Sequence, residues 1–233
     1  ISEKRKDRAD ELSARYGIKV EDIATNVSNA DALLLVVKPQ DMAAVLDEIK
    51  GSINKSAVVI TFAAGKKISF IEQGLGTGNP VVRVMPNTPT LVGAGMAAIS
   101  LGAGVSAKQS EFVSGFLAAT GKVIQVSEDL QDAVTATSGS GPAYFFRFVE
   151  AMVDGAKALG LSDADATTLT IQTIVGAAKL LDESGKSATT LRENVTSPNG
   201  TTAAALTSFE SHQLGDVVAQ AMKAARDRSQ ELA

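Results

Sequence analysis

The chain has 233 residues, 45% of them hydrophobic and 4% aromatic, which is enough for one large domain or two small ones with a mainly aliphatic core. The sequence has no Cys and one His, which excludes a disulfide scaffold, thiolate chemistry and a His/Cys zinc site, and it suits a reducing cytoplasm. The net charge of −4 offers no basic surface for nucleic acid, and we expect neither a signal peptide nor a membrane-spanning segment, since no apolar run reaches about 20 residues.

Short apolar runs alternate with helix-forming sequence over the first half of the chain. We expect helices over residues 3–16, 22–29, 41–49, 69–74 and 107–120, and strands over residues 31–37, 56–62, 80–84, 93–101 and 123–126. The run 31–37 is continuously apolar, which is typical of a strand buried on both faces. This alternation predicts an α/β domain over residues 1–126 with a mainly parallel sheet.

The second half of the chain, residues 127–233, has no strand-like stretch. We expect an all-helical domain there, with helices over residues 130–137, 143–159, 162–184, 187–195, 202–211 and 214–232. The helix over 162–184 is nearly without charge through residues 171–181, so other helices should cover it. So much apolar helical surface in a small domain predicts a dimer interface.

Three predicted strands end in polar or Gly/Pro turns. These turns are Lys38-Pro39-Gln40, Ala63-Ala64-Gly65 and Met85-Pro86-Asn87. Ligands of open α/β sheets bind at the carboxyl ends of the strands, although ordinary strand-to-helix connections look the same in sequence. The basic run Lys4-Arg5-Lys6 is equally open between a cofactor phosphate and a solvated helix start.

Two further loops stand before helices in the second half. Ser138-Gly139-Ser140-Gly141 is a flexible run that precedes Pro142, and taken alone it could be a turn between helices. In Thr196–Thr202, Ser197 is the predicted helix N-cap and Pro198 lies in the first turn. A helix start offers free N–H groups and the positive end of the dipole, which favour a carboxylate or phosphate. A cap without a ligand is the commoner explanation on these residues alone.

Four motifs in this order resemble pyrroline-5-carboxylate reductase. They are Val36–Gln40, Arg83–Pro89, Ser138–Tyr144 and Val195–Thr202, and the similarity extends over essentially the whole chain. The resemblance implies reduction of 1-pyrroline-5-carboxylate to L-proline, the last step of proline biosynthesis, with NADPH or NADH as cofactor. It also implies a Rossmann domain followed by a helical dimerisation domain, with each active site completed by helices of a second subunit.

The resemblance leads to a specific assignment of site residues. Backbone N–H groups of Gly200 to Thr202 and the Ser197 hydroxyl would hold the substrate carboxylate, and Thr202 would be the catalytic donor to the ring nitrogen. The substrate-binding set is Ser138, Gly139, Ser140, Gly141, Ser197, Asn199, Gly200, Thr201 and Thr202. The cofactor-binding set is Val37, Lys38, Pro39, Ala63, Ala64, Gly65, Met85, Pro86 and Asn87. No metal is expected.

The chain departs from the family pattern in two places. The family begins with a strand and a Gly-rich turn that carries the cofactor pyrophosphate, and we expect this first βα unit to be missing from the chain. No pyrophosphate-binding glycine is therefore named. Asn199 stands where the family usually has Gly, and because Asn tolerates left-handed backbone, we expect the loop to keep its shape.

Two alternative functions stand beside the reductase. A β-hydroxyacid dehydrogenase relative would share the architecture but needs a catalytic Lys in the long interdomain helix, where only Lys157 is available, near the helix end. A non-catalytic dimer module is the alternative from another class, and titration with NADPH would distinguish it. Glu150 and Asp154 could form a carboxylate pair on one helix face, but a pair without a partner His is weak evidence. The chain has no Cys and its one His, His212, lies in a distal helix, so no nucleophilic triad can be built.

Overall fold

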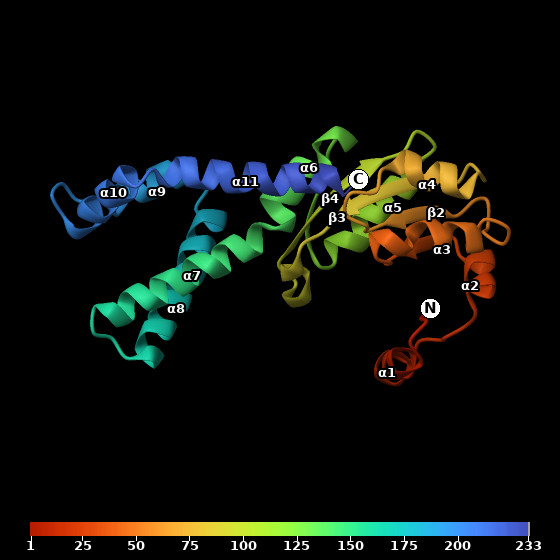
Figure 1. The fold of residues 1–233 in the computed structure, drawn as a ribbon, viewed down its shortest axis with the longest axis horizontal. Coiled ribbons are helices and arrows are strands. Elements are labelled where there is room, and N and C mark those ends of the chain that lie inside the picture. The colour runs from red at the N-terminus through yellow and green to blue at the C-terminus, as the bar shows by residue number, and fades with distance from the viewer. Residues whose placement is uncertain (233) are drawn as a thin grey trace. The chain divides into compact units, whose positions relative to one another are not determined.

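The computed structural model describes residues 1–232, which divide into two compact units (Figure 1). The sheet unit contains residues 1–139 and the end of the chain from Ala225, and the helical unit contains residues 140–224. The last strand ends at Gln125, beside the predicted domain boundary at 126. The division of the units falls later because the segment after this strand stays attached to the sheet, where Gln131 donates to the Ser100 hydroxyl.

A single five-stranded sheet organises the first unit, in the order β1-β2-β3-β4-β5. The strands are β1 (Ala32–Leu35), β2 (Val58–Thr61), β3 (Val81–Met85), β4 (Gly95–Leu101) and β5 (Gly121–Gln125). Among the strands of the described residues, only the β3–β4 pair is antiparallel. The mainly parallel α/β sheet predicted from the sequence is therefore confirmed.

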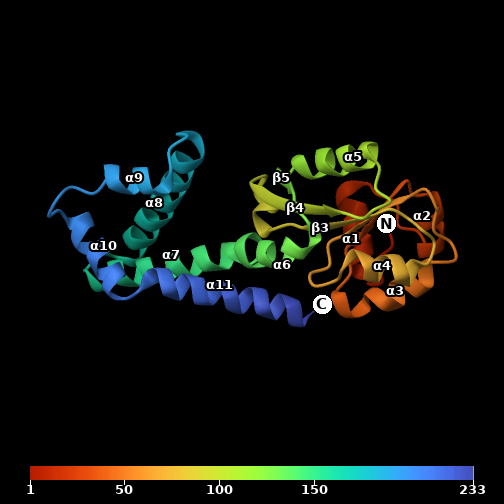
Figure 2. The same ribbon diagram turned by 90° about the horizontal axis from the view of Figure 1, so that it is seen from above.

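Helices cover both faces of this sheet, with α5 on one face and α3 and α4 on the other (Figure 2). The α-helices of the unit are α1 (Lys6–Tyr16), α2 (Ile23–Asn29), α3 (Met42–Ile49), α4 (Ile68–Leu75), α5 (Ala107–Ala118) and α6 (Gln131–Val134). Shorter turns are η1 (Pro39–Asp41), η2 (Thr88–Val92), η3 (Glu128–Leu130) and the π-helical η4 (Thr135–Gly139).

Local sequence signals fix several of these helix ends. Gly17 ends α1 in the left-handed conformation, with φ of 64°. The Asp22 carboxylate accepts the Thr25 N–H at the start of α2, and Ser106 and Gln109 form a capping box at the start of α5. Val45, Leu46 and Ile49 of α3 are buried, which confirms the predicted inward face of that helix.

The expectation that residues 31–37 are buried on both faces is wrong. Leu34 is 39% exposed and Val36 is 76% exposed, while Leu35 is buried. On this side of β1, Leu34 and Val36 line an open groove that no other element of the described chain fills.

The second unit is all-helical, as predicted. Its helices are α7 (Gly141–Ala158), α8 (Asp163–Glu183), α9 (Ala188–Asn194), α10 (Thr201–Ser211) and α11 (Leu214–Glu231), whose last turns belong to the sheet unit. Helix α7 packs on α8, but the expectation that α8 is covered on all sides is wrong within one chain, since Ile171, Val175 and Leu180 are exposed. Among residues 1–232, no helix combines the length and apolar character needed to cross a bilayer.

Candidate active site

Three of the predicted cofactor loops lie along one edge of the sheet. Strands β1, β2 and β3 are parallel neighbours, so their carboxyl ends point the same way. The loops that follow contain Val37, Lys38 and Pro39 after β1, Ala63, Ala64 and Gly65 after β2, and Met85, Pro86 and Asn87 at the end of β3. Gly65 has φ of 76°, a conformation that glycine adopts without strain. The strand order thus places three turns that are separate in sequence side by side at the carboxyl ends of β1, β2 and β3.

Asn87 connects this edge to the Ser138–Gly139 turn. Its side-chain oxygen accepts the Met96 N–H at 2.8 Å, and its amide nitrogen donates to the Ser138 hydroxyl oxygen at 3.2 Å. A Cβ added to Gly139 would lie 2.3 Å from the terminal methyl of Met85, so only glycine allows this approach with Met85 where it is. The structure therefore brings one predicted cofactor loop and two predicted substrate residues into direct contact.

An apolar groove of about 710 Å³ borders the same contact. Pro86, Asn87 and Gly139 line it from the predicted site. Leu34, Val36 and Phe62 complete the wall on the side of β1 and β2. Sequence reasoning missed these three side chains, because an apolar residue in a strand gives no sign of facing a groove rather than the core.

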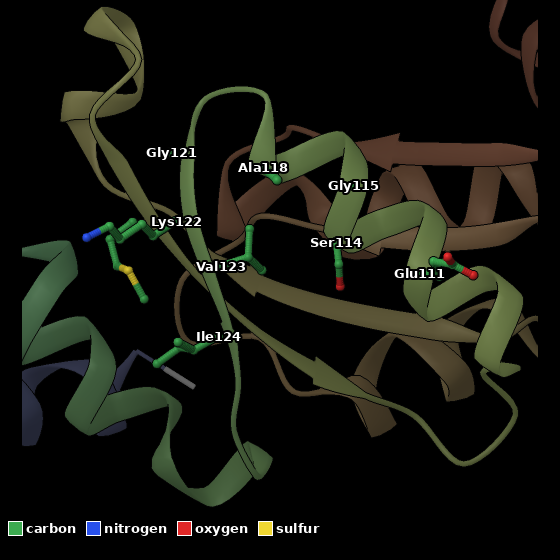
Figure 3. A pocket seen from close by; sticks show the side chains of 9 residues that line it. Glu111, Ser114, Gly115, Ala118, Gly121, Lys122, Val123 and Ile124 are labelled. Carbon is green, nitrogen blue, oxygen red and sulfur yellow. The ribbon is translucent and has the colours of Figure 1, made fainter.

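A second hollow, of about 700 Å³, lies between α5 and β5 (Figure 3). Glu111 and Ser114 line it from α5, and Val123 and Ile124 line it from β5. Within the described part of the chain, none of the predicted site residues borders this hollow. It shares Met96, Gly121 and Lys122 with the apolar groove, so the two hollows are neighbours.

In the helical unit, the predicted substrate loop differs from expectation at its start. Helix α10 begins at Thr201 with Gly200 as its N-cap, so Ser197 is not the cap and Pro198 is not in the first turn. The Gly200 N–H donates to the Ser197 carbonyl at 3.0 Å. The Gly200 amide is therefore not available to bind a carboxylate, contrary to the prediction. The reason is the conformation of Asn199, whose φ of 57° turns the backbone away from the helical path. That value confirms the expected left-handed backbone at Asn199.

The first turn of α10 keeps the chemistry expected of an anion site. Within the described chain, the amides of Thr201 and Thr202 donate to no other group, and neither does the Thr202 hydroxyl. Thr202 is half-buried and Ser197 is exposed. Ser140 is the residue before α7, and Gly141 is buried at the start of that helix, with Pro142 in the first turn as predicted.

The other titratable candidates are engaged in ordinary surface contacts. Glu150 pairs with Arg147 at 2.9 Å, and His212 ends α10 with Nδ1 2.8 Å from the Ser208 carbonyl. Lys157 lies 2.7 Å from Asp163, and this hydrogen bond raises the pKa of Lys157. Lys157 is held in this exposed ion pair near the end of α7, and that position disfavours the dehydrogenase alternative. No cluster of three metal-ligating side chains occurs among the described residues.

Comparison with known proteins decides the family. A model described as pyrroline-5-carboxylate reductase dimerisation matches residues 128–232, and one described as NADP oxidoreductase, coenzyme F420-dependent, matches residues 1–65. Pyrroline-5-carboxylate reductase of Corynebacterium melassecola is 42% identical over all of this chain and 87% of its own length. The chain belongs to the pyrroline-5-carboxylate reductase family.

Solved structures agree with this assignment. The pyrroline-5-carboxylate reductase of Coxiella burnetii superimposes with a TM-score of 0.93 at 37% identity, over 100% of this chain and 87% of that one. The pyrroline carboxylate reductase of Plasmodium falciparum, solved with NADP bound, has a TM-score of 0.86 at 30% identity, over 94% and 83% of the two chains. The family, the two-part fold and the assignment to NAD(P)-dependent oxidoreductases predicted from the motifs are confirmed. The dimerisation match also supports a homo-oligomer.

The residues at the sheet edge fit a nicotinamide dinucleotide. An apolar groove suits a flat ring. At the border of the groove, the side-chain amide of Asn87 is held in place by its hydrogen bonds with the Met96 N–H and the Ser138 hydroxyl. Strand-end loops of parallel sheets are the usual place for such ligands. Lys38 is exposed beside them.

Proposed function

We propose that this chain reduces the cyclic imine 1-pyrroline-5-carboxylate to L-proline in the cytoplasm. The contact between Asn87 and Ser138 carries the proposal, because it joins the predicted cofactor loop to the predicted substrate turn. The absence of Cys is in keeping with a reducing compartment. The measured ratio of kcat/KM for NADPH and NADH would decide the preferred form of the cofactor.

The chemistry asks little acid–base catalysis of the protein. A cyclic imine that has taken a proton is already an electrophilic iminium. The cofactor, when bound, supplies the hydride for the imine carbon. The chain has to hold the substrate by its carboxylate, orient the C=N bond and exclude water. This accounts for a site without a His, Cys or metal cluster.

The first turn of α10 is our candidate for the carboxylate site. The amides of Thr201 and Thr202 and the Ser197 hydroxyl would bind the two oxygens, with the positive end of the helix dipole behind them. The Thr202 hydroxyl, which has no partner among the described residues, would hydrogen-bond at the ring nitrogen. Ser138 to Gly141 would shape the pocket beside the nicotinamide.

We propose further that the helical unit forms the dimer. Large apolar side chains are exposed on its helices, including Phe145, Phe146, Ile171 and Val175. An exposed apolar surface of this extent is typical of an interface. A second copy of the chain is the occupant that the dimerisation match favours. The molar mass in solution would show whether dimers assemble further.

The test is imine-dependent oxidation of NAD(P)H by this chain. Thr202→Ala should lower turnover by about tenfold or more, since one positioned donor is lost, while the Kd for NADPH barely moves. Thr207→Ala, in the same helix with its hydroxyl bonded to the Ala203 carbonyl, is the matched control. Wild-type turnover in Thr202→Ala would remove Thr202 from the mechanism, and failure to bind NADPH below millimolar concentration would favour a non-catalytic dimer module.

A further inference from the structure

Arg83 places a positive charge inside the sheet. It lies in the middle of β3 with its side chain only 6% exposed. One guanidinium nitrogen is 3.3 Å from a Glu128 carboxylate oxygen, and another is 3.9 Å from Asp132. Burial of a charge without partners is costly, so these two acids are what allows Arg83 to remain in the strand.

The two acids each hold a second element. The same Glu128 oxygen accepts the Ile68 N–H at 2.7 Å, which satisfies the first amide of α4. The same Asp132 oxygen accepts the Ser229 hydroxyl at 2.7 Å, and Ser229 lies in the last turns of α11. We call Arg83, Glu128, Asp132 and Ser229 the Arg83 cluster. It ties β3, α4, η3, α6 and the end of α11 together inside the sheet unit.

The Arg83 cluster joins the starts of two segments, residues 83–87 and 132–138, whose other ends meet at the candidate site. Arg83 is two residues before Met85 and four before Asn87, and Asp132 is six residues before Ser138. Between Asp132 and Ser138 the chain passes through the π-helical turn η4. At the far end, Asn87 donates to Ser138 and Gly139 lies against Met85. The strand and the turn are thus fixed to each other at both ends.

A buried ion pair is weak grounds for stability, because the desolvation of the charges offsets their attraction. Its better attested use is to select one arrangement over others. A π-helical turn has a less regular hydrogen-bond pattern than an α-helix and is often found at functional sites. The Arg83 cluster fixes the end of the segment that enters this turn.

We propose that Arg83 is a positioning residue of the reductase. Its ion pairs with Glu128 and Asp132 set the register of η4 against the end of β3, and so hold Ser138 and Asn87 in the geometry that the imine requires. This inference rests on the proposed function, because it assigns Ser138 and Asn87 to the reacting site. Arg83 itself is 5% exposed and is not assigned to the substrate-binding or cofactor-binding set.

The test compares Arg83→Met, which keeps length and removes charge, with Arg83→Lys, which restores a charge that can reach one acid. A displacement of about 1 Å can cost about a hundredfold in rate, so we expect kcat to fall at least about tenfold in Arg83→Met and to recover partly in Arg83→Lys. Arg8→Met breaks an exposed ion pair with Glu11 and should leave kcat unchanged.

Two further measurements separate positioning from general loss of structure. Because Arg83 is proposed to act through Ser138 and Asn87, Arg83→Met should cost less than about twofold in kcat when both of these residues are already Ala, and additive losses would overturn the proposal. Glu128→Gln keeps an acceptor for the Ile68 N–H while it removes the charge, so it should reproduce the loss in kcat without unfolding α4. A kcat within twofold of wild type in both Arg83→Met and Glu128→Gln would also overturn it.

Hydrogen exchange keeps this proposal distinct from the proposed function. The amides of residues 135–139 should exchange at least about tenfold faster in Arg83→Met than in the wild type, while those of α5 are unchanged. If the wild type shows no imine-dependent turnover, the proposed function fails and this exchange result still decides the structural claim. Unchanged exchange at 135–139 would overturn the role of Arg83 whether or not the wild type is active.

Discussion

The sheet unit and the helical unit bury their apolar side chains in different ways. In the sheet unit, Ile60, Ile71 and Ile99 are at most 1% exposed, and helices from the same chain cover both faces of the sheet. In the helical unit, Ile171 and Val175 are 48% and 53% exposed on α8. The difference indicates that elements of the same chain bury the centre of the sheet unit, whereas the exposed side chains of α8 remain available to the second copy proposed above.

The largest expected effect is in the sheet core. Ile60→Ala removes a fully buried side chain between β2 and α5 and should lower the free energy of unfolding by about 2–5 kcal/mol. The urea midpoint of the sheet unit measures it, and the loss should be the same at low and high protein concentration. Ile171→Ala is the matched change in the helical unit, and its cost should grow with protein concentration. If the cost of Ile60→Ala and that of Ile171→Ala depended on protein concentration in the same way, the difference proposed between the two units would be wrong.

The next effect concerns the assembly. Val175→Asp places a charge on the exposed apolar side of α8 and should raise the dissociation constant of the dimer at least about tenfold, or about 1.4 kcal/mol. Sedimentation velocity over a dilution series measures this constant. Val20→Asp, at a position of similar exposure in the sheet unit, is the control. Unchanged assembly in Val175→Asp would mean that α8 lies outside the dimer interface.

Helix capping gives a smaller effect in each unit. The Ser106 hydroxyl accepts the Gln109 N–H at 3.3 Å and completes a capping box at α5. Ser106→Ala should cost about 1 kcal/mol at every protein concentration, measured by urea unfolding. Ser162 caps α8 in the same way, accepting the Asp165 N–H at 3.1 Å. If α8 is stabilised mainly by a second copy, Ser162→Ala should show its cost most clearly in dilute protein.

The smallest effect is a pH dependence at the surface of the sheet unit. The Thr25 hydroxyl and N–H both donate to the Asp22 carboxylate, and these bonds lower the pKa of Asp22 in the folded chain. The carboxylate therefore stabilises the fold above its unfolded pKa of about 3.9, and this contribution is lost as the pH falls through the lower folded value. The urea midpoint of the wild type should exceed that of Asp22→Asn at pH 7 by more than at pH 3. A difference that widens in acid would contradict the assignment.

Local pattern was enough to predict every strand and α-helix, since each depends on neighbours in sequence. The apolar runs at 56–62 and 80–84 became β2 and β3, and Gly17 and Asp22 mark helix ends in sequence and in space. The motifs around Asn87, Ser138 and Thr202 were sufficient for the family. Asn199 was expected to keep a left-handed turn, and it does.

Tertiary structure decided the features that depend on residues far apart in the chain. An arginine within an apolar strand signals that partners must exist, but only the fold shows that Glu128 and Asp132, at least 45 residues away, supply them. The same holds for the Asn87–Ser138 contact and for Leu34 and Val36 at the edge of the sheet. Periodicity reports which side of an element is apolar, whereas burial and pairing depend on what the rest of the chain, or a second chain, brings against that side.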